Sequence, residues 1–134
     1  AAPLFRIHLL GEVHRLLLEQ SGQCDDYQKD HQQRDRITIG ALGQLRGAGI
    51  EKEEVDFYLL HQANRRIISA AVKRLGLEEE RFPMNMEEYG NTSAASIPIL
   101  LYEENRRGKL KKDSLLVLSG FGGGLTYGAS LLRW

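Results

Sequence analysis

Two polar residues thirty positions apart are the side chains of this sequence best suited to chemistry: His61 in the run LLHQANRR and Asn91 in the run YGNTSAAS. An imidazole and a carboxamide both donate hydrogen bonds without needing a formal charge. Such donors stabilise negative charge that develops on an oxygen when water is excluded. A third run, SGFGGGLTYGASLLRW from Ser119 to Trp134, contains a glycine cluster. Consecutive glycines let main chain approach a ligand closely.

The elements around His61 are predicted from periodicity. The apolar run VDFYLLH, residues 55–61, predicts a buried strand that ends near His61. Residues 64–75 have the apolar spacing of a helix, and Gly76 is its expected stop. We therefore expect His61 at a strand-to-helix junction, where open α/β sheets place their ligand sites.

Asn91 is expected in an equivalent place. The sequence before it is turn-like, and Thr92 or Ser93 is predicted to cap a helix over residues 93–107. Pro98 lies inside this pattern, so a kink or a later helix start is open. Asn91 would then precede a helix N-terminus, which favours negative charge.

Further strands are predicted over residues 114–120 and 126–133, joined through the glycines, and a strand near 81–87 is left open. A phosphate-binding loop is not indicated, because no Lys-Ser/Thr pair follows the glycines and a strand comes next. Taken alone, the glycine cluster is a tight hairpin, and a histidine at a strand end is more often structural than catalytic.

Together the three runs carry a resemblance. From about Gly49 to its end, the chain resembles the C-terminal half of a β-ketoacyl-acyl-carrier-protein synthase III, a condensing enzyme of the thiolase superfamily. The resemblance implies an α/β fold: the C-terminal half of a thiolase-like fold, with a mixed sheet and packed helices. It implies decarboxylative Claisen condensation of an acyl group from acyl-CoA with malonyl-acyl carrier protein (malonyl-ACP), which starts fatty-acid synthesis in the cytoplasm without a cofactor.

The same resemblance implies roles for single residues. His61 and Asn91 would be catalytic and would hydrogen-bond the malonyl thioester carbonyl as decarboxylation turns it into an enolate. Arg65 and Arg66 would dock the acidic carrier protein, although taken alone they are an ordinary solvated helix face. The other implied positions are Phe121, Gly122 and Gly123 along the acyl pocket, and Ala63 and Asn64 beside the pantetheine or coenzyme A arm.

The first part of the chain does not share the resemblance. Residues 4–20 are predicted to form an amphipathic helix, Ser21 to Arg36 a linker or disordered segment, and Ile37 to Ala48 a second helix. We divide the chain into a divergent segment, residues 1–36, and a synthase III C-terminal domain, residues 37–134. A fragment, a shifted reading frame and a divergent fusion all remain open for the first segment.

The family's nucleophile is a cysteine in its N-terminal half, at a helix N-terminus that lowers the thiol pKa. Cys24 is the only cysteine here and precedes two aspartates, so it is rejected in that role. We therefore expect this chain to be inactive alone and to need the N-terminal half, or a partner chain, to supply the cysteine. The alternative is a non-catalytic binding or assembly module for a carrier protein or partner subunit. The full-length family is expected to be homodimeric.

Composition weighs against other classes of function. The 18 basic residues are balanced by 18 acidic ones, so nucleic-acid binding is not expected. No apolar run approaches the length of a membrane span. A single cysteine suits a reducing cytoplasm. No metal is expected, because Cys24, His8, His14 and His31 are scattered.

Overall fold

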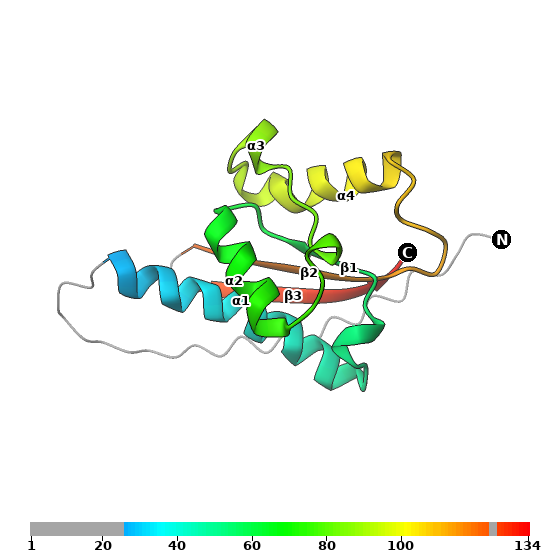
Figure 1. Ribbon diagram of the computed structural model, residues 1–134, viewed down its shortest axis with the longest axis horizontal. Helices are drawn as coiled ribbons and strands as arrows, with labels where there is room; N and C mark the ends of the chain where they lie inside the picture. The colour runs from blue at the N-terminus through cyan, green and yellow to red at the C-terminus, as the bar shows by residue number, and fades with distance from the viewer. Residues whose placement is uncertain (1–25, 124–125) are drawn as a thin grey trace.

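The structure is a computed structural model that describes residues 26–123 and 126–134. Within these residues, three strands form one mixed sheet in the order β1-β2-β3 (Figure 1). Strand β1 (Phe57–Leu60) is parallel to β2 (Leu115–Gly122), and β2 is antiparallel to β3 (Thr126–Arg133). The predicted α/β class and its mixed sheet are confirmed.

Helices cover both faces of this sheet. Helices α1 (Asp26–Ala48) and α2 (Arg65–Leu75) lie on one side, and α4 (Ser96–Arg106) lies on the other (Figure 1). The short helix α3 (Met86–Tyr89) lies beside α4. Three 3₁₀ turns complete the described elements: η1 (Lys52–Glu54), η2 (Glu79–Arg81) and η3 (Ser93–Ala95).

The two faces of the sheet have separate cores. Tyr58 and Leu60 of β1 pack into the cluster formed with α1 and α2, whereas Leu59 packs into the cluster formed with α4. Strand β2 alternates in the same way, with Val117 in the first cluster and Leu116 in the second. Burial on both faces explains why these strands are continuous apolar runs instead of polar–apolar alternations.

The junction predictions for α2 and α4 are largely confirmed. Gly76 ends α2 in the left-handed conformation, at φ 64°. Pro98 is the third residue of α4, within the first turn, where its missing N–H has no intrahelical acceptor to lose. The later helix start is therefore correct. The predicted cap by Thr92 or Ser93 is wrong, because Thr92 makes no capping hydrogen bond and the N-cap of α4 is Ala95.

Two other predictions are wrong. Residues 81–87 form no strand; they belong to η2, a connecting segment and the start of α3. The predicted linker is helical from Asp26 onward, because α1 continues in the N-terminal direction from its packed half around Ile37, Ala41 and Leu45. Tertiary packing supplies a helix nucleus that polar residues then extend. The helix predicted for residues 4–20, and Cys24, lie outside the described residues.

Helix α1 approaches the sheet closely at Gly40. A Cβ atom there would lie 3.3 Å from the Tyr127 ring and 3.4 Å from the Ser119 hydroxyl. The Ser119 hydroxyl donates a hydrogen bond of 2.9 Å to the carbonyl of Ile37. This contact fixes α1 against the segment of β2 that leads into the glycine run.

In the described part of the chain, no helix has the length and apolar character needed to cross a membrane.

Candidate active site

A cleft of about 780 Å³ opens where β1 and β2 end. The N–H of His61 donates to the carbonyl of Ser119 at 2.8 Å, which extends the parallel pairing by one residue and places His61 beside the glycine run. Seven of the nine predicted site residues line this cleft: His61, Ala63, Asn64, Asn91, Phe121, Gly122 and Gly123. The tertiary structure thus brings the three sequence runs to one place, at the carboxyl ends of parallel strands.

The imidazole of His61 is half-buried and held from two sides. Its Nδ1 lies 2.7 Å from the hydroxyl oxygen of Ser96. Its ring meets Phe121 edge-on, with centroids 5.4 Å apart and planes at 73°. Burial lowers the pKa of His61 below its ordinary value. The ring is therefore neutral near pH 7, when one nitrogen donates a hydrogen bond and the other accepts one.

We expect His61 to titrate below 6.5 in the folded chain. Because its folded pKa is depressed, the neutral form stabilises the fold above the unfolded pKa, and this contribution is lost as the pH falls through the folded pKa. A histidine-resolved NMR titration measures the pKa, and denaturant unfolding at several pH values measures the stability. Titration of His61 at or above 6.5 would contradict the burial of its ring.

The side chain of Asn91 is held by the backbone of Ser93. Its Oδ1 accepts a hydrogen bond of 3.0 Å from the N–H of Ser93, and its side-chain NH₂, which can donate, makes no hydrogen bond to another described residue. Gly90 precedes it at φ 66° and ψ −155°, a conformation nearly restricted to glycine. Ser93 follows at φ 54°, which is uncommon for a residue with a side chain. Unusual backbone on both sides of Asn91 determines where its amide points.

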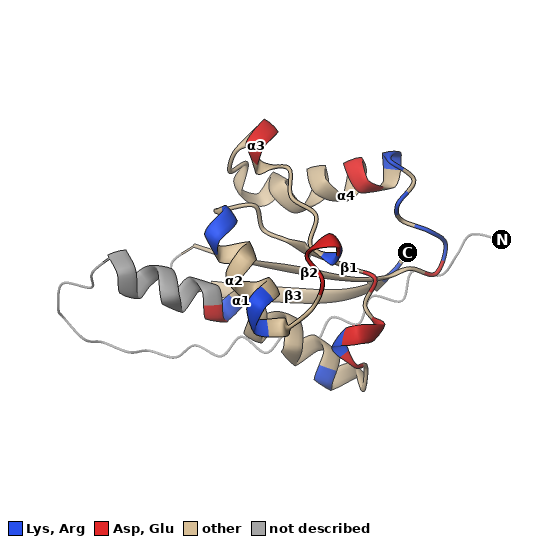
Figure 2. Ribbon diagram, viewed as in Figure 1, with Lys and Arg blue, Asp and Glu red and all other residues tan. Residues whose placement is uncertain are grey.

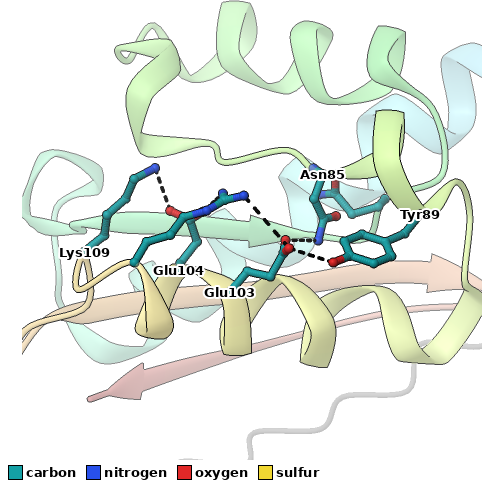
Figure 3. Close-up of polar contacts among 7 residues, drawn as sticks. Asn85, Tyr89, Glu103, Glu104 and Lys109 are labelled. Atoms are coloured by element: carbon teal, nitrogen blue, oxygen red, sulfur yellow. Dashed lines mark hydrogen bonds and ion pairs between the residues drawn. The ribbon is translucent and has the colours of Figure 1, made fainter.

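A polar network on α4 supports the segment that carries Asn91 (Figure 3). Glu103 accepts hydrogen bonds from the amide of Asn85 at 2.7 Å and from the hydroxyl of Tyr89 at 2.9 Å. These two residues lie at opposite ends of α3, so one carboxylate fixes both. The Asn85 hydrogen bond is the main cause that lowers the pKa of Glu103.

The same network reaches the residue next to His61. Gln62 is buried, and its side-chain oxygen accepts a hydrogen bond of 3.1 Å from the backbone N–H of Asn85. The segments carrying His61 and Asn91 are therefore tied together behind the cleft. Further along α4, the buried carboxylate of Glu104 pairs with Arg107 at 2.6 Å and Lys109 at 2.8 Å (Figure 3).

Sequence reasoning missed these supporting residues. One signal was present in the spacing along α4. Glu103 and Glu104 follow Ser96 by seven and eight residues, which places all three on the same face of the helix as Leu100. Polar residues on an apolar helical stripe must find partners when buried. The partners themselves were not readable, because they come from segments distant in the sequence.

The two predicted docking arginines lie at the start of α2, outside the cleft lining. Asn64 caps this helix by accepting a hydrogen bond of 2.8 Å from the N–H of Arg66. Arg65 pairs with Glu87 at 2.5 Å. Arg66 is exposed and has no ion-pair partner among the described residues. Figure 2 shows basic residues at both ends of α2.

Residues 45–134 match the family described as 3-oxoacyl-[acyl-carrier-protein (ACP)] synthase III C terminal. The chain is 56% identical over 90 residues to β-ketoacyl-[acyl-carrier-protein] synthase III of Geobacillus kaustophilus, covering 67% of this chain and 29% of the relative. It is 53% identical over 99 residues to a β-ketoacyl-[acyl-carrier-protein] synthase III 1 of Bacillus cereus, covering 74% of this chain and 32% of that protein.

Solved structures agree with the sequence match. The 3-oxoacyl-[acyl-carrier-protein] synthase III of Aquifex aeolicus superposes with a TM-score of 0.79 at 39% identity, over 84% of this chain and 36% of that one. The Thermus thermophilus β-ketoacyl-[acyl carrier protein] synthase III gives a TM-score of 0.78 at 37% identity, over 82% and 34% of the two chains. This chain therefore spans about a third of the length of the proteins it matches.

Proposed function

Because this chain belongs to the 3-oxoacyl-[acyl-carrier-protein] synthase III family through the C-terminal part of that family, we propose that it supplies half of a condensing active site. The observation that carries this proposal is the pairing of two neutral hydrogen-bond donors on one cleft. Burial lowers the pKa of His61, which favours its neutral form, and Asn91 has its oxygen engaged while its NH₂ makes no hydrogen bond to another described residue.

The proposed chemistry is decarboxylative Claisen condensation. The malonyl thioester loses carbon dioxide, and the electron pair of the broken C–C bond moves into an enolate. His61 and Asn91 donate to the enolate oxygen as its charge develops. The enolate carbon then attacks the carbonyl of an acyl-cysteine thioester, a C–C bond forms, and the cysteine thiolate leaves. Preorganised donors outside bulk water contribute several kcal/mol to such a step.

The remaining residues of the cleft are proposed to bind the substrates. The ring of Phe121 holds His61 edge-on, and with Gly122 and Gly123 it would border the acyl group. Ala63 and Asn64 would contact the pantetheine arm that acyl-CoA and the carrier protein share. We propose that this chemistry needs no cofactor and takes place in the cytoplasm. We also propose that the full-length protein is a homodimer and that the domain boundary in this chain lies between residues 36 and 37.

The nucleophile is proposed to come from the N-terminal half of a synthase III or from a partner chain. A direct test is a chimera in which the N-terminal part of the Geobacillus kaustophilus relative precedes residues 45–134 of this chain. Intact mass measures acyl loading, and carbon dioxide release and product formation measure condensation. We expect the chimera to condense and this chain alone not to be acylated.

Two results would contradict these assignments. Stoichiometric acylation of Cys24 in the chain alone would overturn the proposal that the nucleophile comes from elsewhere. A folded chimera that loads its cysteine and yet forms no product would favour the alternative, a non-catalytic module that docks a carrier protein through the α2 surface. The observation that favours this alternative is that Arg66 is exposed and has no ion-pair partner among the described residues.

Docking of the carrier protein gives its own prediction. Arg66→Glu should weaken binding of malonyl-ACP to the chimera by about tenfold at low salt, because it replaces attraction to an acidic surface with repulsion. Lys73→Glu, a charge reversal on an exposed residue of the last turn of α2, is the matched control. Titrations at low and high salt should show the Arg66 effect shrinking as salt screens it. Equal losses for both variants would argue against a specific docking role.

A further inference from the structure

We propose that Ser96 is a positioning residue that holds His61 in the tautomer with its proton on Nε2, so that this nitrogen donates into the cleft. Only the acceptor in the cleft, an enolate oxygen, depends on the proposed function. The tautomer follows from hydrogen bonds that the chain makes by itself. The resemblance to the synthase III family implies no role for this serine, and neither do the names of the similar proteins.

Ser96 sits between the two halves of the site. It is the first residue of α4, is 2% exposed, and is one of the residues that line the cleft with His61. Its hydroxyl oxygen lies 2.7 Å from Nδ1 of His61 and 3.3 Å from the backbone N–H of Gln62. The backbone N–H can only donate, so the oxygen accepts from Gln62.

The remaining question is where the hydroxyl proton points. Among the described residues, the hydrogen bonds of the Ser96 side chain are those to Gln62 and His61. If Nδ1 donated to the oxygen, the oxygen would accept twice and its own proton would have no acceptor in a nearly inaccessible position. A buried donor without an acceptor costs about 1–3 kcal/mol. If the hydroxyl donates to Nδ1 instead, every group is satisfied.

With Nδ1 accepting, the proton of the neutral imidazole must lie on Nε2. No carboxylate among the described residues pairs with His61, so an ionic partner does not compete in setting the tautomer. Nε2 has no hydrogen-bond partner among those residues and is the nitrogen left for a ligand in the cleft. The cleft then presents two N–H donors, Nε2 of His61 and Nδ2 of Asn91.

The test is the tautomer itself, read by long-range ¹H–¹⁵N NMR of the ¹⁵N-labelled 134-residue chain above the pKa of His61. The signals of His61 are assigned by difference with His61→Asn. We expect Nε2 protonated and Nδ1 unprotonated. A protonated Nδ1, or rapid averaging of both tautomers with an ordinary pKa, would overturn the proposal.

Two variants separate positioning from simple folding. Ser96→Ala removes the hydroxyl, so Nδ1 loses its donor and we expect a mixture of tautomers. Ser96→Thr retains the hydroxyl and should restore the wild-type pattern. An unchanged tautomer in Ser96→Ala would overturn the proposal. If Ser96→Ala does not fold, the wild-type and Ser96→Thr spectra still decide it.

Kinetics of the chimera then distinguish this inference from the proposed function. Ser96→Ala should lower kcat for condensation by about tenfold, the effect of one neutral hydrogen bond, with KM nearly unchanged, and Ser96→Thr should recover most of the rate. An Nε2–H tautomer in a chimera that does not condense would sustain the role of Ser96 and contradict the function. An Nδ1–H tautomer in an active chimera would contradict the role of Ser96 and leave the proposed function standing.

Discussion

Replacing His61 by Ala in the chimera should lower the rate of condensation about 100- to 1,000-fold, while acyl loading of the cysteine continues. The variant removes one of two donors that would act on the enolate oxygen. Loading is proposed to take place at a cysteine of the N-terminal part of the chimera, so the loss should be concentrated in the decarboxylation step. Carbon dioxide release and intact mass after acyl-CoA treatment measure the two steps separately.

The donor interpretation makes two comparisons informative. Asn91→Ala should give a loss of similar size, and the double variant should lose less than the product of the single losses, because groups that act as a unit are not additive. His61→Asn, which retains a neutral N–H donor, should retain more activity than His61→Ala. An unchanged carbon dioxide release in His61→Ala would remove His61 from the proposed mechanism.

Gly90→Ala should destabilise the chain by about 1–3 kcal/mol and reduce condensation in the chimera by at least about tenfold. A Cβ atom at Gly90 would meet no atom within 4 Å, so the cost is in the backbone and not in crowding. At φ 66° and ψ −155° an alanine is strained, and relief of that strain turns the next residue, Asn91. Displacement of the Asn91 donor then lowers the rate.

Gly43→Ala is the matched control for this substitution. A Cβ atom at Gly43 would likewise meet no atom within 4 Å, but Gly43 lies in α1, where alanine is favoured by about 1 kcal/mol over glycine. The Gly43 variant should therefore keep activity and stability or gain stability. Denaturant unfolding and steady-state rates measure both variants. Equal behaviour of the two would show that the backbone at Gly90 does not position Asn91.

Local pattern was sufficient for the elements that border the cleft. Strand β1 is an apolar run rich in large side chains, α2 has a clear apolar stripe with a glycine stop, and β2 and β3 flank a glycine run. Each of these signals lies within a few residues of the element it predicts. The same local signals placed His61 and Asn91 at the ends of elements, whereas their partnership with the glycines came from the resemblance to the synthase III family.

Local pattern failed where packing decided the conformation. Residues 26–36 read as a polar linker, yet they continue a helix whose packed half starts near Ile37. For residues 81–87 the local pattern leaves a strand possible, yet the segment ends in α3, which Glu103 holds through Asn85 and Tyr89. The expected cap at Thr92 is absent, and the side chain of Asn91 bonds to the N–H of Ser93 instead.

By itself, the sequence determined the types of the candidate catalytic groups and the ends of elements at which they stand, since both depend on residue identity and short-range periodicity. Only the tertiary structure decided how those groups are held. The hydroxyl of Ser96 meets His61 across 35 positions, and the backbone N–H of Asn85 meets Gln62 across 23. Such contacts follow from the positions of α3 and α4 beside the sheet, and no local spacing encodes which buried polar group will satisfy another.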